Sequence, residues 1–136
     1  MNIFLDTNIF LDLLFKRMGS EQAERIFQLI QSQLYKGFVA DITLLNIDYI
    51  ARKQSCNVRQ FLYFVELNFN VLGAENKDIL TALDLDNDDL EDNVQFVLAK
   101  KSSCNLIISN DKSFLQLDIP VINSRNFVEK YEVNFE

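Results

Sequence analysis

The chain has 136 residues, 49% of them hydrophobic, and 13 Lys and Arg against 20 Asp and Glu give it a net charge of −7. This length and this apolar content suit one core, so we predict a single domain over residues 1–136. The chain has no histidine, and its two cysteines, Cys56 and Cys104, lie far apart, which excludes a structural zinc site and any mechanism that needs an imidazole base.

Short apolar runs alternate with amphipathic segments from the start of the chain. Asn2–Leu5 is an apolar run that ends at Asp6, and it predicts a first strand. Dense apolar residues over Ile9–Phe15 then predict a short buried helix. Ser20 can cap a second helix, whose apolar residues keep the helical period until Gly37 stops it.

The rest of the chain continues this alternation. Further strands are predicted at Phe38–Ala40, Phe69–Leu72, Leu106–Ile108 and Pro120–Ile122. Further helices are predicted at Asp41–Lys53, from Asn57 to about Glu66, at Asn76–Leu83, from about Asp89 to Lys101, and at Ser124–Tyr131. We therefore predict an α/β fold, a three-layer α/β/α sandwich with a central, largely parallel sheet of about five strands.

Three aspartates fall where such a sheet binds ligands, beyond the carboxyl ends of its strands. Asp6 follows the first predicted strand, Asp111 follows the fourth, and Asp92 lies in the first turn of the preceding helix. One such aspartate alone is more often a cap or turn residue, so the prediction rests on all three together. Carboxylates gathered without a cation repel by on the order of 1 kcal/mol per close pair, and a divalent ion reverses that sign. Ligation by oxygen alone selects Mg²⁺, Mn²⁺ or Ca²⁺.

Three motifs occur in order along the chain, at residues 4–12, 89–95 and 107–114. The first of them, FLDTNIFLD, resembles the opening motif of PIN domains. The D-x-x-D motif at the start of a later helix resembles residues 89–95, DLEDNVQ, and the last motif resembles residues 107–114, IISNDKSF. The resemblance covers essentially the whole chain, because residues 119–122 are also similar to the closing strand.

The resemblance implies a Mg²⁺- or Mn²⁺-dependent endoribonuclease of the VapC type, the toxin of a toxin–antitoxin pair. It implies that Asp6, Asp92 and Asp111 bind the metal and position water for attack on RNA, with Asp89 as a further or water-mediated ligand. The ion would lower the pKa of that water and stabilise charge on the phosphate. Supporting hydrogen-bonding groups would be Thr7, Asn8 and Ser109. Implied partners are RNA and an antitoxin, and a homodimer is a further prediction.

Two cations are our candidates for contacts with RNA. Arg17 and Lys112 each lie within about a dozen residues of a predicted metal ligand. The other cations of the chain are expected to be solvated surface residues.

One position departs from the family pattern. Many PIN nucleases carry a Glu on the helix after the second strand, and Asn46 stands at the matching place. An Asn oxygen can ligate a metal but brings no charge, so we expect weaker metal binding. Asp41 and Asp48 are potential substitutes, although Asp48 lies about 200° round the helix from Asn46 and is expected to face elsewhere. The alternative is therefore a catalytically silent PIN-like module that binds protein or RNA, and the net charge of −7 also favours it.

Other folds and a membrane location fit the sequence less well. A haloacid-dehalogenase-like phosphatase needs a second Asp where this chain has Asn8, and a receiver-like domain needs an Asp that Val71–Gly73 does not provide. Apolar runs such as Ile9–Phe15 are too short to span a bilayer, and the start lacks a basic segment followed by a cleavable apolar stretch. We predict a soluble, cytoplasmic protein.

Overall fold

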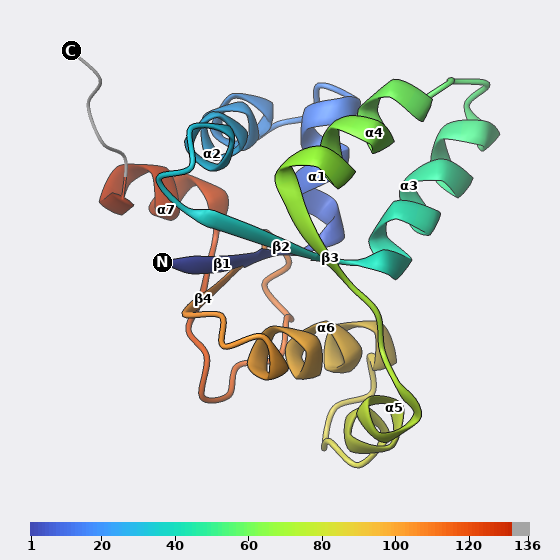
Figure 1. Cartoon of the computed structure of the whole chain (residues 1–136), viewed down its shortest axis with the longest axis vertical. Coiled ribbons are helices and arrows are strands. Elements are labelled where there is room, and N and C mark those ends of the chain that lie inside the picture. The colour runs from blue at the N-terminus through green and yellow to red at the C-terminus, as the bar shows by residue number, and fades with distance from the viewer. Residues whose placement is uncertain (132–136) are drawn as a thin grey trace.

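A parallel five-stranded sheet forms the middle of the computed structural model, which describes residues 1–131 (Figure 1). Its strand order is β3-β2-β1-β4-β5, and every neighbouring pair is parallel. The strands are β1 (Asn2–Leu5), β2 (Lys36–Ala40), β3 (Phe69–Leu72), β4 (Leu106–Ile108) and β5 (Val121–Ile122). The sequence-based prediction of an α/β fold with about five largely parallel strands is confirmed.

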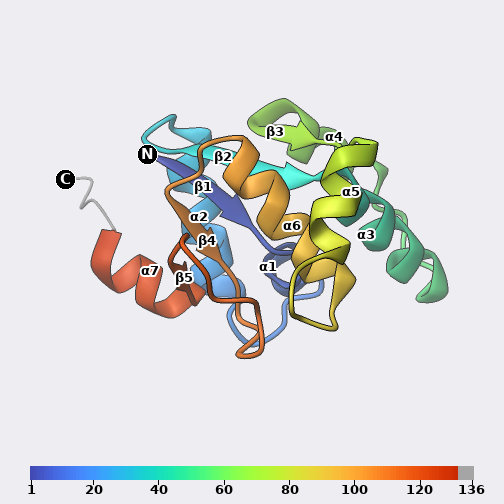
Figure 2. The same cartoon turned by 90° about the horizontal axis from the view of Figure 1, so that it is seen from below.

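Helices cover both faces of this sheet. They are α1 (Thr7–Leu14), α2 (Ser20–Gln31), α3 (Asp41–Lys53), α4 (Arg59–Asn68), α5 (Asn76–Leu83), α6 (Leu90–Lys101) and α7 (Ser124–Tyr131). The first four helices and α7 pack on one face, while α5 and α6 pack on the other (Figures 1 and 2). This arrangement is the predicted α/β/α sandwich.

Strand β1 shows why the sheet is buried on both sides. Ile3 and Leu5 point into the core beneath α1 and α2, and Phe4 points into the core beneath α6. All three side chains are fully buried. Successive residues of a strand face opposite sides, so a parallel sheet covered by two helical layers needs a continuous apolar run such as this one.

A cluster of phenylalanines fills the larger core. Phe10, Phe27 and Phe69 form a Phe cluster in which each pair of ring centroids lies between 5.2 and 5.3 Å apart. The chain at Gly37 passes so close to this cluster that an added Cβ would lie 2.7 Å from Phe69 Cδ2. Only glycine leaves room for the Phe69 ring at this point of β2.

Several boundaries differ from the predicted ones by a few residues. Helix α1 begins at Thr7 rather than Ile9, because Asp6 caps it. Helix α2 ends at Gln31, and the chain reverses through Gln33, whose φ is 67°. Pro120 precedes β5 and joins the sheet only through its carbonyl, which accepts the Ile107 N–H at 2.9 Å.

None of the helices within residues 1–131 is both long enough and apolar enough to cross a membrane.

Candidate active site

An open, acidic cavity of about 470 Å³ lies where β1 and β4 end and α6 begins. Five acidic side chains line this acidic cleft: Asp6, Asp89, Glu91, Asp92 and Asp111. The other described residues that line it are Thr7, Asn8, Leu11, Asn46, Tyr49 and Ile50. The described lining therefore contains no lysine or arginine. The structure brings together the three aspartates that the sequence predicts as metal ligands.

Asp6 joins β1 to α1 and caps the helix. Its Oδ1 accepts hydrogen bonds from the Thr7 backbone N–H at 2.7 Å and from Gln95 Nε2 at 3.0 Å, and its Oδ2 accepts one from Ser109 Oγ at 2.7 Å. Burial still raises the pKa of Asp6, because the loss of water outweighs these hydrogen bonds. These donors fix the direction of the Asp6 carboxylate, but all of them are neutral groups, so none offsets its negative charge.

Asp92 lies in the first turn of α6, and only 5% of it is exposed. Burial raises the pKa of Asp92 to about 7, and repulsion from neighbouring acids, with Asp6 the largest contributor, adds to the effect. Within residues 1–131, no hydrogen-bond donor reaches its buried Oδ2. Buried polar atoms nearly always have a partner, so this oxygen indicates a ligand from outside the chain.

Ser109 and Asp111 follow β4 and connect its end to that of β1. The Ser109 hydroxyl donates to Asp6 and accepts the Asp111 N–H at 3.1 Å. Asp111 Oδ1 accepts hydrogen bonds from the Ser113 hydroxyl at 2.7 Å and from its N–H at 2.9 Å, which lower the pKa of Asp111. Asp111 therefore holds a negative charge at the open side of the acidic cleft.

Glu91 also faces the acidic cleft, although sequence reasoning did not single it out. Its Oε1 accepts hydrogen bonds from Asn46 Nδ2 at 3.0 Å and from Thr7 Oγ1 at 3.4 Å. Burial, followed by repulsion from Asp6 and Asp89, raises the pKa of Glu91. Adjacent residues lie about 100° apart round a helix, so the helical period alone does not show that Glu91 shares the cleft with its neighbour Asp92.

Gln95 is a second residue that sequence reasoning missed. It is fully buried on α6 and donates to Asp6. Its Oε1 is buried and accepts no hydrogen bond from the described residues. The signal in the sequence was the spacing. Gln95 follows Asp92 by three residues, so a helix places both side chains on one face.

The remaining predicted residues divide into two groups. Asp89 caps α6 by accepting the backbone N–H of the third helical residue at 3.2 Å, and Asn8 lines the same cleft. Arg17 lines a separate cavity on the α2 side, and Lys112 lines a cavity that shares Asp111 with the acidic cleft. Sequence proximity to a predicted metal ligand therefore did not place either cation among the residues that line the cleft.

The donor chemistry of the acidic cleft fits a hard divalent cation. Carboxylate and amide oxygens are the ligands of Mg²⁺ and Mn²⁺, and the orphan oxygen of Asp92 lies among them. Within residues 1–131, however, no three acidic or cysteine side chains are arranged so that they could hold one ion as they stand. Both oxygens of Asp6 and Oδ1 of Asp111 accept hydrogen bonds from protein donors. Metal binding by these residues stays a prediction.

The metal-free protein should lose stability as pH rises from about 4 towards 7. The pKa of Asp92 rises from its ordinary value of 3.8 to about 7 on folding, so in this interval the folded state holds a proton that the unfolded state has released. Stability must fall with rising pH wherever the folded state binds more protons. We expect the Tm in EDTA to decrease between pH 5 and pH 7.5, and Asp92→Asn to flatten the profile. A wild-type Tm that rises over this range would contradict the prediction.

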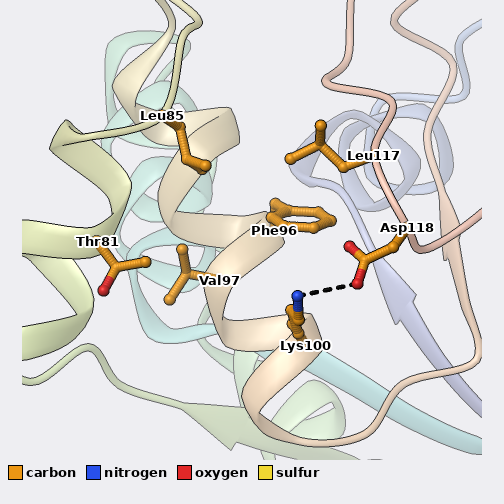
Figure 3. A pocket seen from close by; sticks show the side chains of 7 residues that line it. All are labelled: Thr81, Leu85, Phe96, Val97, Lys100, Leu117 and Asp118. Atoms are coloured by element: carbon orange, nitrogen blue, oxygen red, sulfur yellow. Dashed lines mark ion pairs between the residues drawn. The ribbon is translucent and has the colours of Figure 1, made fainter.

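A more apolar cavity, of about 700 Å³, lies between α5, α6 and a later loop (Figure 3). It is lined by Thr81, Leu85, Phe96, Val97, Lys100, Leu117 and Asp118. The one acid among these residues is Asp118, which pairs with Lys100 at 2.9 Å. The acidic cleft, and not this cavity, holds the groups that can carry hydrolytic chemistry.

The sequence of the chain is similar to a known family and to a curated protein. A family model described as PIN domain matches residues 2–113. The curated protein "Ribonuclease VapC1" of Aquifex aeolicus (strain VF5) is 26% identical over 136 residues, which cover 95% of this chain and 94% of that protein.

Two solved structures share the fold. A chain of a toxin–antitoxin complex from Klebsiella pneumoniae superposes with a TM-score of 0.68 and 18% identity, covering 90% of this chain and 97% of that one. A chain from VapBC2 of Rickettsia felis, bound to a DNA fragment from its promoter, gives a TM-score of 0.66 and 14% identity, covering 90% and 98%.

Proposed function

The chain belongs to the PIN domain family, and from this premise we propose that it is a Mg²⁺- or Mn²⁺-dependent endoribonuclease and the toxin of a toxin–antitoxin pair. The similarity to a ribonuclease of the VapC type along nearly the whole chain supports the activity. The similarity of the fold to chains of toxin–antitoxin complexes supports the pairing with an antitoxin.

The observation that carries the proposal is the unpaired oxygen of Asp92 in a cleft of five acids. Burying a carboxylate beside like charges destabilises a fold unless a cation offsets the repulsion. Phosphate binding also needs positive charge, and the described lining of the cleft supplies none. A bound divalent ion answers both requirements at once.

The residues of the chain prepare this site in distinct ways. Ser109, Gln95 and the Thr7 N–H fix the direction of the Asp6 carboxylate, and Ser113 fixes that of Asp111. The cleft is open to solvent, so the extended backbone of a single-stranded RNA can enter it. When bound, the ion would supply an activated water and stabilise charge on the phosphate, which makes a histidine base unnecessary.

An exposed apolar stripe at the edge of the acidic cleft suits an antitoxin. Ile42, Leu45 and Tyr49 lie three and four residues apart along α3, so they share one face. Leu45 is 69% exposed and Tyr49 is 52% exposed, and Tyr49 also lines the cleft. A partner that covered this stripe would lie against the entrance to the site and could block access of RNA.

The second candidate function is the catalytically silent PIN-like module. Asn46 in place of an acid and the net charge of −7 favour it. The carboxylate of Glu91 beside Asn46 weakens the first of these arguments, because the cleft is not short of acids at that place.

Cleavage of RNA in the presence and absence of metal tests the proposal. The purified protein should degrade a labelled single-stranded RNA with Mn²⁺ or Mg²⁺ and should leave it intact with EDTA. The reason is that the described lining of the cleft contains no Lys or Arg side chain that could replace the metal ion. Cleavage that persists in EDTA would contradict the metal requirement. RNA binding without cleavage at any metal concentration would favour the silent module.

A further inference from the structure

Asn46 and Glu91 face each other across the acidic cleft. Asn46 lies on α3 and Glu91 lies in the first turn of α6, and the Asn46 amide donates to Glu91 Oε1 at 3.0 Å. Both residues line the cleft. A Glu side chain is one methylene longer than Asn, so a carboxylate carried by position 46 would occupy the space that the Glu91 carboxylate already fills.

A second donor to the Glu91 carboxylate is the hydroxyl of Thr7, which is itself in contact with Thr43. Thr7 Oγ1 lies 3.4 Å from Glu91 Oε1 and 2.8 Å from Thr43 Oγ1. A hydroxyl has one proton, so when Thr7 donates to Glu91, Thr43 must donate to Thr7. Glu91 is thus fixed by donors from α1 and α3 through Oε1, while no described residue donates a hydrogen bond to Oε2.

The neighbouring residue supplies an independent indication of a ligand here. Asp92 is 5% exposed, lines the same cleft, and keeps an Oδ2 that no described group satisfies. Glu91 and Asp92 both line the cleft, so a ligand that satisfies Asp92 would lie in the same cavity as the Glu91 side chain.

The other acids near Asn46, Asp41 and Asp48, lie outside the acidic cleft. Asp48 pairs with Arg52 at 3.1 Å and lines a different cavity, which confirms the expectation that it faces elsewhere. The Asp41 carboxylate lies beside Gly73, where an added Cβ would be 3.1 Å from Oδ2. Neither residue lines the acidic cleft.

We propose that Glu91 supplies the carboxylate that this chain lacks at position 46, so that α6 in place of α3 provides the fourth acid for a bound Mn²⁺ or Mg²⁺. Asn46 then acts as a positioning residue that holds Glu91 through its amide. The proposal rests on the metal-dependent function proposed above. It predicts that a variant with Glu at position 46 and Gln at position 91 still binds the metal ion.

The test measures Mn²⁺ affinity by calorimetry, together with the Tm in EDTA and in Mn²⁺, for wild type and three variants. Glu91→Gln should weaken Mn²⁺ binding by roughly ten-fold or more, in line with the loss of a metal-site contact. The exchange variant Asn46→Glu/Glu91→Gln should recover most of that affinity. Asp48→Asn removes the same charge from a residue outside the cleft, so it should bind Mn²⁺ like wild type.

A fourth variant measures the coupling between the two positions. Asn46→Glu alone would bring a second carboxylate against the first, where a hydrogen bond of 3.0 Å now lies, and should therefore lower the Tm in EDTA. Adding Glu91→Gln should reverse that loss, because the pair becomes complementary again. These Tm values also report whether each variant folds.

The possible results separate the two proposals. Wild-type Mn²⁺ affinity in Glu91→Gln would overturn the role of Glu91 and leave the metal-dependent function standing. Loss of binding in Glu91→Gln without recovery in the exchange variant would overturn the substitution of one position for the other. Absence of Mn²⁺ binding by the wild-type protein would overturn the metal site itself.

Discussion

Asp6→Asn is expected to reduce Mn²⁺-dependent RNA cleavage by about three orders of magnitude, which corresponds to about 4 kcal/mol of transition-state stabilisation. Asp6 is the most extensively fixed acid of the cleft, with donors from Thr7, Gln95 and Ser109. An amide in its place can keep the contacts from Thr7 and Gln95 and the shape of the site while removing the charge. The rate of cleavage of a labelled RNA at saturating Mn²⁺ measures the effect.

The same variant should fold as well as wild type. The oxygen of the introduced amide can accept from Thr7 and Gln95 as the carboxylate does. Its nitrogen can donate to Ser109 Oγ once the Ser109 hydroxyl turns its proton away from position 6. Burial raises the pKa of Asp6, which means that its charge destabilises the metal-free fold. The Tm in EDTA at neutral pH should therefore be unchanged or higher. Wild-type cleavage by Asp6→Asn, with Asp48→Asn as the matched control, would remove Asp6 from the proposed mechanism.

Phe10→Ala should have the largest effect on stability, lowering the free energy of unfolding by about 3–5 kcal/mol. Phe10 is fully buried on α1 and lies 5.2 Å from Phe27 and 5.3 Å from Phe69 between ring centroids. Its loss would leave a cavity in the middle of the Phe cluster, where three elements meet. Domains of this size are stable by only about 5–15 kcal/mol, so much of the total would be lost. Urea unfolding followed by circular dichroism measures the difference.

Two comparison variants show whether the loss comes from packing. Phe10→Leu keeps most of the buried volume and should cost clearly less than Phe10→Ala. Tyr63→Ala removes an aromatic ring that is 60% exposed on α4 and should change the free energy of unfolding by less than about 1 kcal/mol. Equal losses for Phe10→Ala and Tyr63→Ala would mean that the Phe cluster is not the main contributor to stability.

The fold was predictable because local pattern and global architecture agree along most of the chain. The apolar run at Asn2–Leu5 gave β1 with its observed bounds, and the order of strands and helices was also correct. Boundaries failed where a cap or a turn decided them. The pattern could not show that Asp6 would cap α1 directly, or that the chain would leave α2 at Gln31 and turn through Gln33.

The candidate site was predictable only in part. The rule that parallel sheets bind ligands at their carboxyl edge correctly brought Asp6 and Asp111 together, because both follow neighbouring strands. The meeting of Glu91 with Asn46 depends on how α6 and α3, which cover opposite faces of the sheet, approach at that edge. No local pattern encodes that approach. Arg17 and Lys112 line other cavities, since distance along the chain says little about distance in space, and their contact with RNA stays a prediction.

The position of β1 at the centre of the sheet links the site to the order in which the chain is made. Among the strands of this sheet β1 is made first, yet it lies between β2 and β4, and Asp6 receives its hydrogen bond from Ser109, 103 residues later. Contacts between residues so far apart in the sequence slow folding. During synthesis the cleft cannot be complete until Ser109 and Asp111 have emerged after β4, so a shorter nascent chain cannot carry the whole site.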